Sequence, residues 1–135
     1  MIDIKTIYYD LGVAVKGICD KVYPRSRPKS VDSKINSYIV VYLPSEFVNN
    51  EMDDEGRYSD YTTTIQFEVY VRDSASASNP NGFEVAKVSE IVKAVQAKFP
   101  IMTDNISVRH PRITMQTDDG DGFSVTIIQG SLRTK

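Results

Sequence analysis

The chain has 135 residues, a length that suits a single domain, and its 41% hydrophobic and 10% aromatic residues argue against wholesale disorder. Sixteen basic and 18 acidic residues give a net charge of −2, so the overall field gives no reason to expect attraction to nucleic acid or to an anionic membrane. The only cysteine, Cys19, excludes an internal disulfide and a zinc site of clustered thiolates, which fits a reducing compartment.

The N-terminal segment has none of the features of an export signal. It lacks a basic start, an uninterrupted apolar run and a small-residue cleavage site. No apolar run along the chain approaches the roughly 18 residues that a membrane-spanning helix requires. We therefore expect a protein that is made in the cytoplasm and does not enter a membrane.

A first helix is expected over residues 3–21. Asp3 can cap its first turn, and apolar side chains follow at three-and-four spacing: Ile4, Ile7, Tyr8, Leu11, Ala14, Val15, Ile18 and Val22. Gly12 and Gly17 each weaken this helix by about 1 kcal/mol relative to alanine, so it must gain stability by docking. The basic segment that follows, residues 21–29, is expected to be a solvated loop, with a short extended piece at 21–25.

Two strands are expected in the middle of the chain. Residues 35–44 are apolar at both parities, which is typical of a strand covered on both faces. Residues 58–72 alternate, with Ile65, Phe67 and Val69 on one face. We therefore expect Phe67→Asp to unfold the protein and Glu68→Lys to leave it folded. The acidic segment between these strands, residues 44–57, is expected to be a long mobile connection.

The second half of the chain predicts a helix followed by a hairpin. Small, turn-forming residues at 73–82 indicate a mobile loop. An apolar stripe then predicts a helix over residues 82–98, which Pro100 stops. Two strands surround a turn at 118–122. Phe123, Val125 and Ile127 share one parity in the last strand, whereas Ile128 and Leu132 lie on the other.

The element order α-β-β-α-β-β predicts an α+β fold in a single domain spanning residues 1–135. Its sheet is expected to be mainly antiparallel and four-stranded, with two helices packed on one face. The other face would then carry an apolar patch, and such patches usually mark association. The candidate interaction residues are Tyr38, Tyr42, Phe47, Met52, Tyr70 and Ile128. Alternatively, the loop 44–57 folds back and covers this patch within one subunit.

Candidates for catalysis are few. His110 is the only histidine and precedes Pro111, which favours extended geometry, so we expect a partly exposed strand residue. Cys19 has helical spacing with apolar neighbours and is expected to be a small core residue. The chain has no phosphate-binding loop, dinucleotide fingerprint, zinc-protease motif or nucleophile elbow. We therefore expect no enzyme activity and no cofactor.

Two acidic groups invite a metal hypothesis. The segment TDDGDGF, residues 117–123, fails the EF-hand pattern that starts at Asp119, because its fifth position is Phe123 and its twelfth is Gly130. A hairpin turn is the better interpretation. The carboxylates within residues 51–55 could bind Mg²⁺ or supply two catalytic carboxyls, but neighbouring charges in a loop repel one another into solvent. We expect no metal site.

Three features in a fixed order support a family resemblance. They are an N-terminal helix that runs into VYP (22–24) and the strand IVVY (39–42), a tyrosine-rich strand at 61–73 followed by a small-residue loop and a helix, and a closing hairpin at 118–127. Together they cover nearly the whole chain. In order and spacing they resemble the small tail-terminator and tail-completion proteins at the head-to-tail junction of long-tailed bacteriophages.

This resemblance implies a structural virion protein without catalysis. It would form a homo-oligomeric ring, most often a hexamer, that ends the tail tube and contacts the tail-tube protein and a head-completion protein, with no sequence-specific nucleic acid. The long acidic loop departs from the family, so no interface residue is transferred. Two alternatives are another neck or ring component of a virion or injection machine, and a small ligand-binding α+β domain whose sheet and loop 44–57 enclose a pocket.

Overall fold

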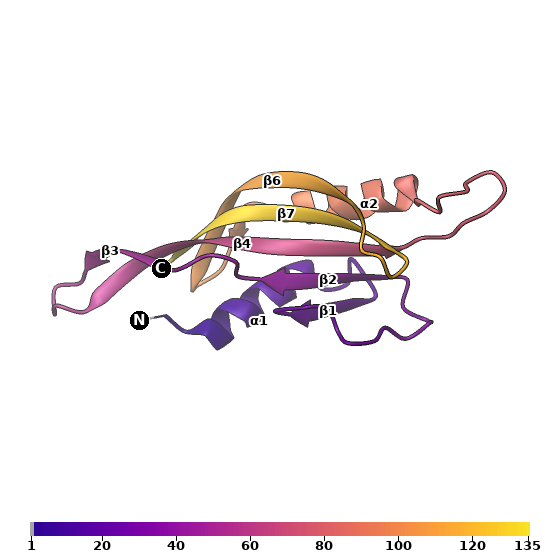
Figure 1. Ribbon diagram of the computed structural model, residues 1–135. Helices are drawn as coiled ribbons and strands as arrows, with labels where there is room; N and C mark the ends of the chain where they lie inside the picture. The colour runs from indigo at the N-terminus through magenta and orange to yellow at the C-terminus, as the bar shows by residue number, and fades with distance from the viewer. Residues whose placement is uncertain (1) are drawn as a thin grey trace.

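The computed structural model describes residues 2–135, except for the side chain of Thr117. Along these residues run two helices and seven strands: α1 (Ile4–Val15), β1 (Lys21–Pro24), β2 (Ser37–Tyr42), β3 (Val48–Met52), β4 (Tyr58–Arg72), α2 (Val85–Gln96), β5 (Ile101–Met102), β6 (Ile106–Asp118) and β7 (Phe123–Thr134). All seven strands belong to one sheet of order β1-β2-β4-β7-β6-β5, and β3 pairs with β4 outside this path (Figure 1).

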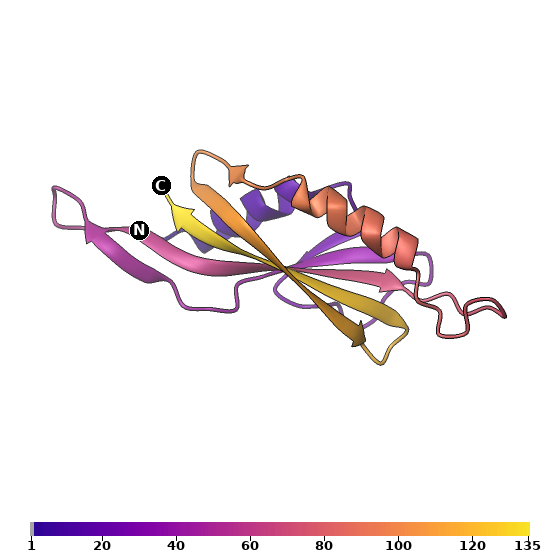
Figure 2. The same cartoon turned by 90° about the horizontal axis from the view of Figure 1, so that it is seen from above.

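The prediction of a mainly antiparallel four-stranded sheet with two helices is wrong. The sheet has seven strands and is mixed, because β1 runs parallel to β2 while the other neighbours are antiparallel. It also curls, so that β6 crosses over β4 when seen from above (Figure 2). The short extended piece expected at 21–25 is β1, whereas β3 and β5, with five and two residues, were not expected. Such strands are too short to show an alternating pattern.

The helices lie within the predicted ranges but are shorter. The Asp3 carboxylate accepts a hydrogen bond from the Thr6 backbone N–H at 3.1 Å and so caps α1. The helix ends at Val15 rather than at residue 21, because Gly17 adopts a φ of +86°, which breaks the helical path. Neither of the two helices within residues 2–135 has the length and apolar character that a membrane span requires.

Both helices pack against one face of the sheet, here called the helix face (Figure 2). α1 buries Ile7, Leu11 and Val15 there, and α2 buries Val88, Ile91, Val92 and Val95. From β4 the same core receives Ile65, Phe67, Val69 and Val71, all at most 1% exposed. The parity predicted for this strand is therefore confirmed.

The face opposite the helices, here called the second face, is covered over β2, the end of β4 and the start of β7, whereas residues 109–116 of β6 are exposed. Its buried residues form an aromatic cluster of Tyr38, Val40, Tyr70, Phe123 and Val125. Tyr23, Val31 and Ile35 pack over this cluster, and two of these three come from residues 25–36, a segment that we call the strap. The prediction that β2 is covered on both faces is confirmed, but the cover is the strap and not the loop 44–57.

Candidate assembly surfaces

Stacked rings hold the aromatic cluster together. The rings of Tyr38 and Tyr70 lie nearly parallel, with their centroids 4.5 Å apart. Phe123 and Tyr23 each meet the Tyr38 ring edge-on, at 5.3 and 5.6 Å. Burial raises the pKa of Tyr38 to about 12, so its phenol stays neutral. Tyr38 and Tyr70 therefore belong to the interior of the subunit.

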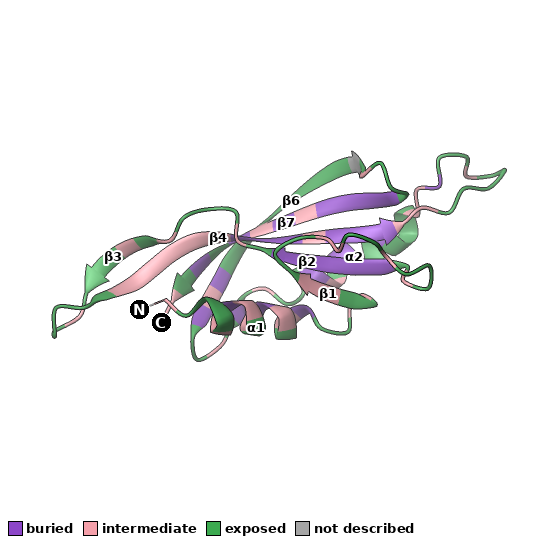
Figure 3. Ribbon diagram, turned by 60° about the horizontal axis from the view of Figure 1, so that its bottom comes forward, coloured by how far each residue is buried: buried purple, intermediate pink, exposed green. Residues whose placement is uncertain are grey.

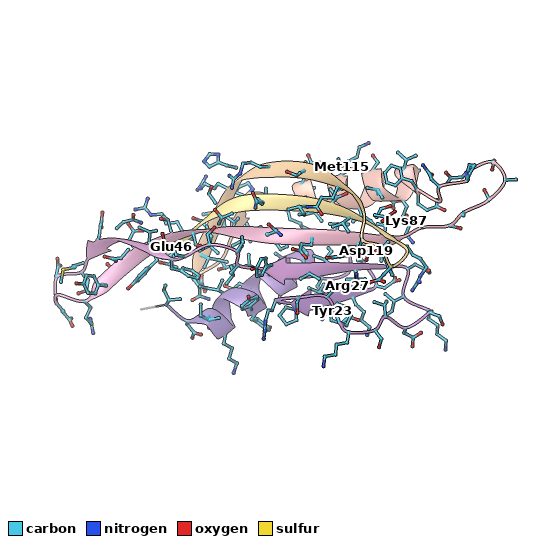
Figure 4. The ribbon with its side chains drawn as sticks, in the orientation of Figure 1. Tyr23, Arg27, Glu46, Lys87, Met115 and Asp119 are labelled. Carbon is cyan, nitrogen blue, oxygen red and sulfur yellow. The ribbon has the colours of Figure 1, made fainter. Side chains whose placement is uncertain are left out.

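Charged groups fasten the strap over this cluster. The Arg27 guanidinium lies 2.6 Å from an Asp119 carboxylate oxygen and 3.1 Å from one of Asp121, so it bridges the strap to the β6–β7 turn (Figure 4). Arg72 donates to the Ile35 carbonyl at 2.8 Å and stacks 4.6 Å from the Phe123 ring. The basic segment 21–29 is thus not a freely solvated loop, since Arg27 has a structural role.

The turn at 118–122 is a hairpin, as predicted. Gly120 and Gly122 have φ of +81° and +88°, which glycine adopts without steric cost. The carboxylate of Asp119 accepts hydrogen bonds from the backbone N–H groups of Asp121 and Phe123, at 2.7 and 3.1 Å. Asp119 is therefore occupied both by the turn and by Arg27.

The six candidate interaction residues do not form one surface. Tyr38 and Tyr70 are buried in the aromatic cluster. Ile128 is buried on the helix face, because it pairs with Phe67 and shares its side of the sheet. Phe47 is half-buried against the same core, whereas Tyr42 and Met52 are 37% and 55% exposed. The apolar patch expected from these residues does not exist within the subunit.

A two-stranded arm projects from the body instead. β4 pairs with β7 only as far as Thr62, so its first residues, 58–61, pair with β3 alone. We call residues 48–61 the arm. It extends beyond the rest of the molecule in both views (Figures 1 and 2). The acidic segment expected as a loop therefore contains a strand, and the turn at residues 54–56 directly before a long strand was the signal for a hairpin.

An ion pair fixes the base of the arm. Asp60 has a φ of +57°, unusual for a residue other than glycine, at the point where β4 leaves β7. Both carboxylate oxygens of Asp60 accept hydrogen bonds from Arg133, each at 2.6 Å. These hydrogen bonds hold the pKa of the Asp60 carboxyl below its ordinary value. The arm thus leaves the sheet in a defined direction.

The surface of the arm combines apolar and acidic side chains. No residue between 48 and 61 is buried (Figure 3). Val48, Met52 and Tyr58 are 49%, 55% and 60% exposed, and Met52 lies directly opposite Tyr58. Four carboxylates surround the tip, and Arg57 pairs with two of them, those of Asp53 and Glu55. The arm therefore exposes apolar side chains, and its tip carries a net negative charge.

An apolar groove lies between α1 and β1. Its volume is about 590 Å³. Tyr9, Gly12 and Val13 line it from the helix, and Val22 and Pro24 line it from the strand. Tyr9 and Val13 are 70% and 51% exposed, so the helix side of the groove is open to solvent. We call this feature the α1–β1 groove.

The remaining candidates are not brought together into one centre. His110 is an exposed residue of β6 and sits at a β-bulge with a φ of +59°. Cys19 is half-buried beside the helix-face core. Within the described part of the chain, no group of three or more His, Cys, Asp or Glu side chains is arranged to hold a metal ion.

The Cys19 thiol is expected to react slowly. Burial raises its pKa to about 11, so very little thiolate is present at pH 8. Because the thiolate is the nucleophile, alkylation by iodoacetamide should be about 10- to 100-fold slower than that of an unstructured cysteine. A labelling time course at pH 8 followed by mass spectrometry measures this rate, with urea-unfolded protein as the control. Equal rates in the two samples would contradict the burial of the thiol.

Comparison with known proteins assigns no family: a scan against protein-family models and a search of curated proteins both find no match.

Proposed function

We propose that this protein is a structural subunit that assembles with copies of itself into a ring at the end of a phage tail tube. The ring would halt growth of the tube and present a surface to the head-completion protein, and the proposal gives the protein no catalytic role. It combines the family resemblance of the sequence with one structural observation, the arm. A body with a filled core on each face of its sheet, whose arm extends exposed apolar side chains, is suited to bind a neighbour.

The arm also bears on the alternative of a ligand-binding domain. That alternative required the loop 44–57 to close over the sheet and enclose a pocket. Residues 48–61 instead extend away from the sheet (Figure 1), and the strap occupies the second face. Over β2 and its neighbours both sheet faces are therefore filled by the protein's own side chains, which favours assembly over the enclosed pocket.

Electron microscopy of the purified protein mixed with tail tubes tests the proposal. If a tail-tube gene lies beside the gene of this protein, the tubes should be assembled from its product. We expect a ring-shaped cap at one end of each tube, and tubes that stop growing once capped. A protein that leaves tube length unchanged, stays monomeric at high concentration and co-purifies with a small molecule would overturn the proposal.

A further inference from the structure

We infer that the arm of one copy binds in the α1–β1 groove of the next copy. This inference rests on the proposed ring and names the contact that would build it. The two surfaces are different parts of the chain, so the contact is head-to-tail. Such a contact closes into a ring when the rotation between neighbours divides a full turn.

The arm needs a partner for physical reasons. A two-stranded hairpin is only marginally stable in water by itself, and within the arm β3 pairs with β4 alone. Val48 and Met52 are separated by four positions on β3, so they lie on the same face of the strand. Both are about half exposed. Docking against a neighbouring copy would bury this apolar face and place a further element beside the two strands of the arm.

The groove matches the arm, because it offers an apolar surface and the unpaired edge of a strand. Its walls are largely apolar, and its volume of about 590 Å³ can accept a few side chains. β1 is an edge of the sheet, and β3 pairs only with β4 among the described strands. Each therefore has an unpaired edge of backbone N–H and C=O groups. An arm in the groove would bring these two edges together, as in other cases of strand addition.

The charges on the two surfaces also favour binding of the arm in the groove. Lys16 and Lys21 line the groove and are exposed. Asp20 lies between them in the sequence, but its carboxylate accepts hydrogen bonds from the backbone N–H groups of Asn36 and Ser37, at 2.8 and 3.4 Å. The Asp20 carboxylate keeps its negative charge, so the two lysines leave the rim of the groove with a net charge of +1, opposite in sign to the tip of the arm. Complementary charges of this kind speed association and select the correct partner.

The arm cannot reach the groove of its own chain. In both views the tip points away from the body, while Figure 1 shows β1 beside α1 at the edge of the sheet next to β2. The ion pair between Asp60 and Arg133 fixes this direction. An arm that occupies the groove must therefore belong to a second copy.

Disulfide trapping tests the contact. In a Cys19→Ser background, Gly12→Cys places a thiol in the groove and Met52→Cys places one on the arm. Position 12 tolerates the change, because a Cβ there meets no other atom within 4 Å. We expect mild oxidation to give a ladder of covalent oligomers on a non-reducing gel, whose top band counts the subunits of the ring. The control replaces Met52→Cys by Ser78→Cys, on the exposed loop after β4, and should give no ladder.

The trapping experiment is run on the free protein and on protein mixed with tail tubes. Absence of the ladder in both samples, or an equal ladder with the Ser78→Cys control, would overturn the docking of the arm in the groove. The tube-capping assay of the unmodified protein separates the two proposals. If the protein caps tubes but gives no ladder, the contact between arm and groove is overturned and the proposed role in the tail is kept. If it gives a ladder but does not cap tubes, the contact is supported and the proposed role in the tail is overturned.

Charge reversal provides a second readout. The pair Lys16→Glu and Lys21→Glu should slow formation of the ladder about 10-fold or more, because the groove then repels the acidic tip. Adding Glu51→Lys and Asp54→Lys on the arm should restore the rate to within about threefold of the original. A rate that the arm substitutions fail to restore would count against the contact.

Discussion

Replacement of Phe67 by aspartate is expected to leave the protein unfolded at room temperature. Phe67 is fully buried at the centre of β4, where it pairs with Val41 on one side and Ile128 on the other, and its ring meets Phe99 edge-on at 6.3 Å. Removing the ring costs about 3–5 kcal/mol, and burying a carboxylate adds several more. Together these costs approach the total stability of an ordinary domain, about 5–15 kcal/mol. Far-UV circular dichroism and a thermal melt measure the outcome.

The neighbouring residue provides the matched control. Glu68 points to the second face, where it accepts hydrogen bonds from the Gln66 side-chain amide at 2.6 Å and from the Tyr70 hydroxyl at 3.1 Å. The sequence alone predicted that Glu68→Lys would fold normally, but a lysine would leave both donors without their acceptor. Glu68→Gln keeps one acceptor oxygen and is expected to retain a native melt. A native melt for Phe67→Asp would contradict the buried position of that side chain.

The sequence predicted those elements whose pattern extends over many residues. β4 alternates over 15 residues, and its predicted and observed bounds agree at both ends. The two helices were located by their apolar stripes and the last hairpin by its glycines. In each case the signal is local, because neighbouring residues in the sequence are also neighbours in the structure.

The features that the sequence missed depend on distant parts of the chain. β3 is polar and five residues long, and it is a strand because β4 lies beside it. The strap covers the second face because Arg27 meets Asp119, 92 positions away in the sequence. Neither partner carries a pattern that indicates the other. The candidate surface was wrong for the same reason, since burial of Tyr38 and Tyr70 follows from the position of the strap.

The second large effect is expected when Asp119 is replaced by alanine. Its side chain is only 7% exposed, and it binds Arg27 as well as two backbone N–H groups of the turn. Asp119→Ala leaves these donors without an acceptor and releases the strap from the aromatic cluster. Because Arg27 is 30% exposed, water can partly replace the lost carboxylate, so we expect a loss of about 2–4 kcal/mol. Urea unfolding followed by circular dichroism measures this change.

Replacing Asp121 shows how much of the stability loss expected for Asp119→Ala comes from the buried contact and how much from the loss of a negative charge. It contacts the same guanidinium at 3.1 Å, but its side chain is 67% exposed. Asp121→Ala removes the same formal charge from the same turn and should cost less than about 1 kcal/mol, since exposed ion pairs contribute little. If the two substitutions cost the same, long-range charge rather than the buried contact would fasten the strap. Near-UV circular dichroism of the stacked tyrosines then distinguishes a loosened strap, expected only for Asp119→Ala, from a change confined to the turn.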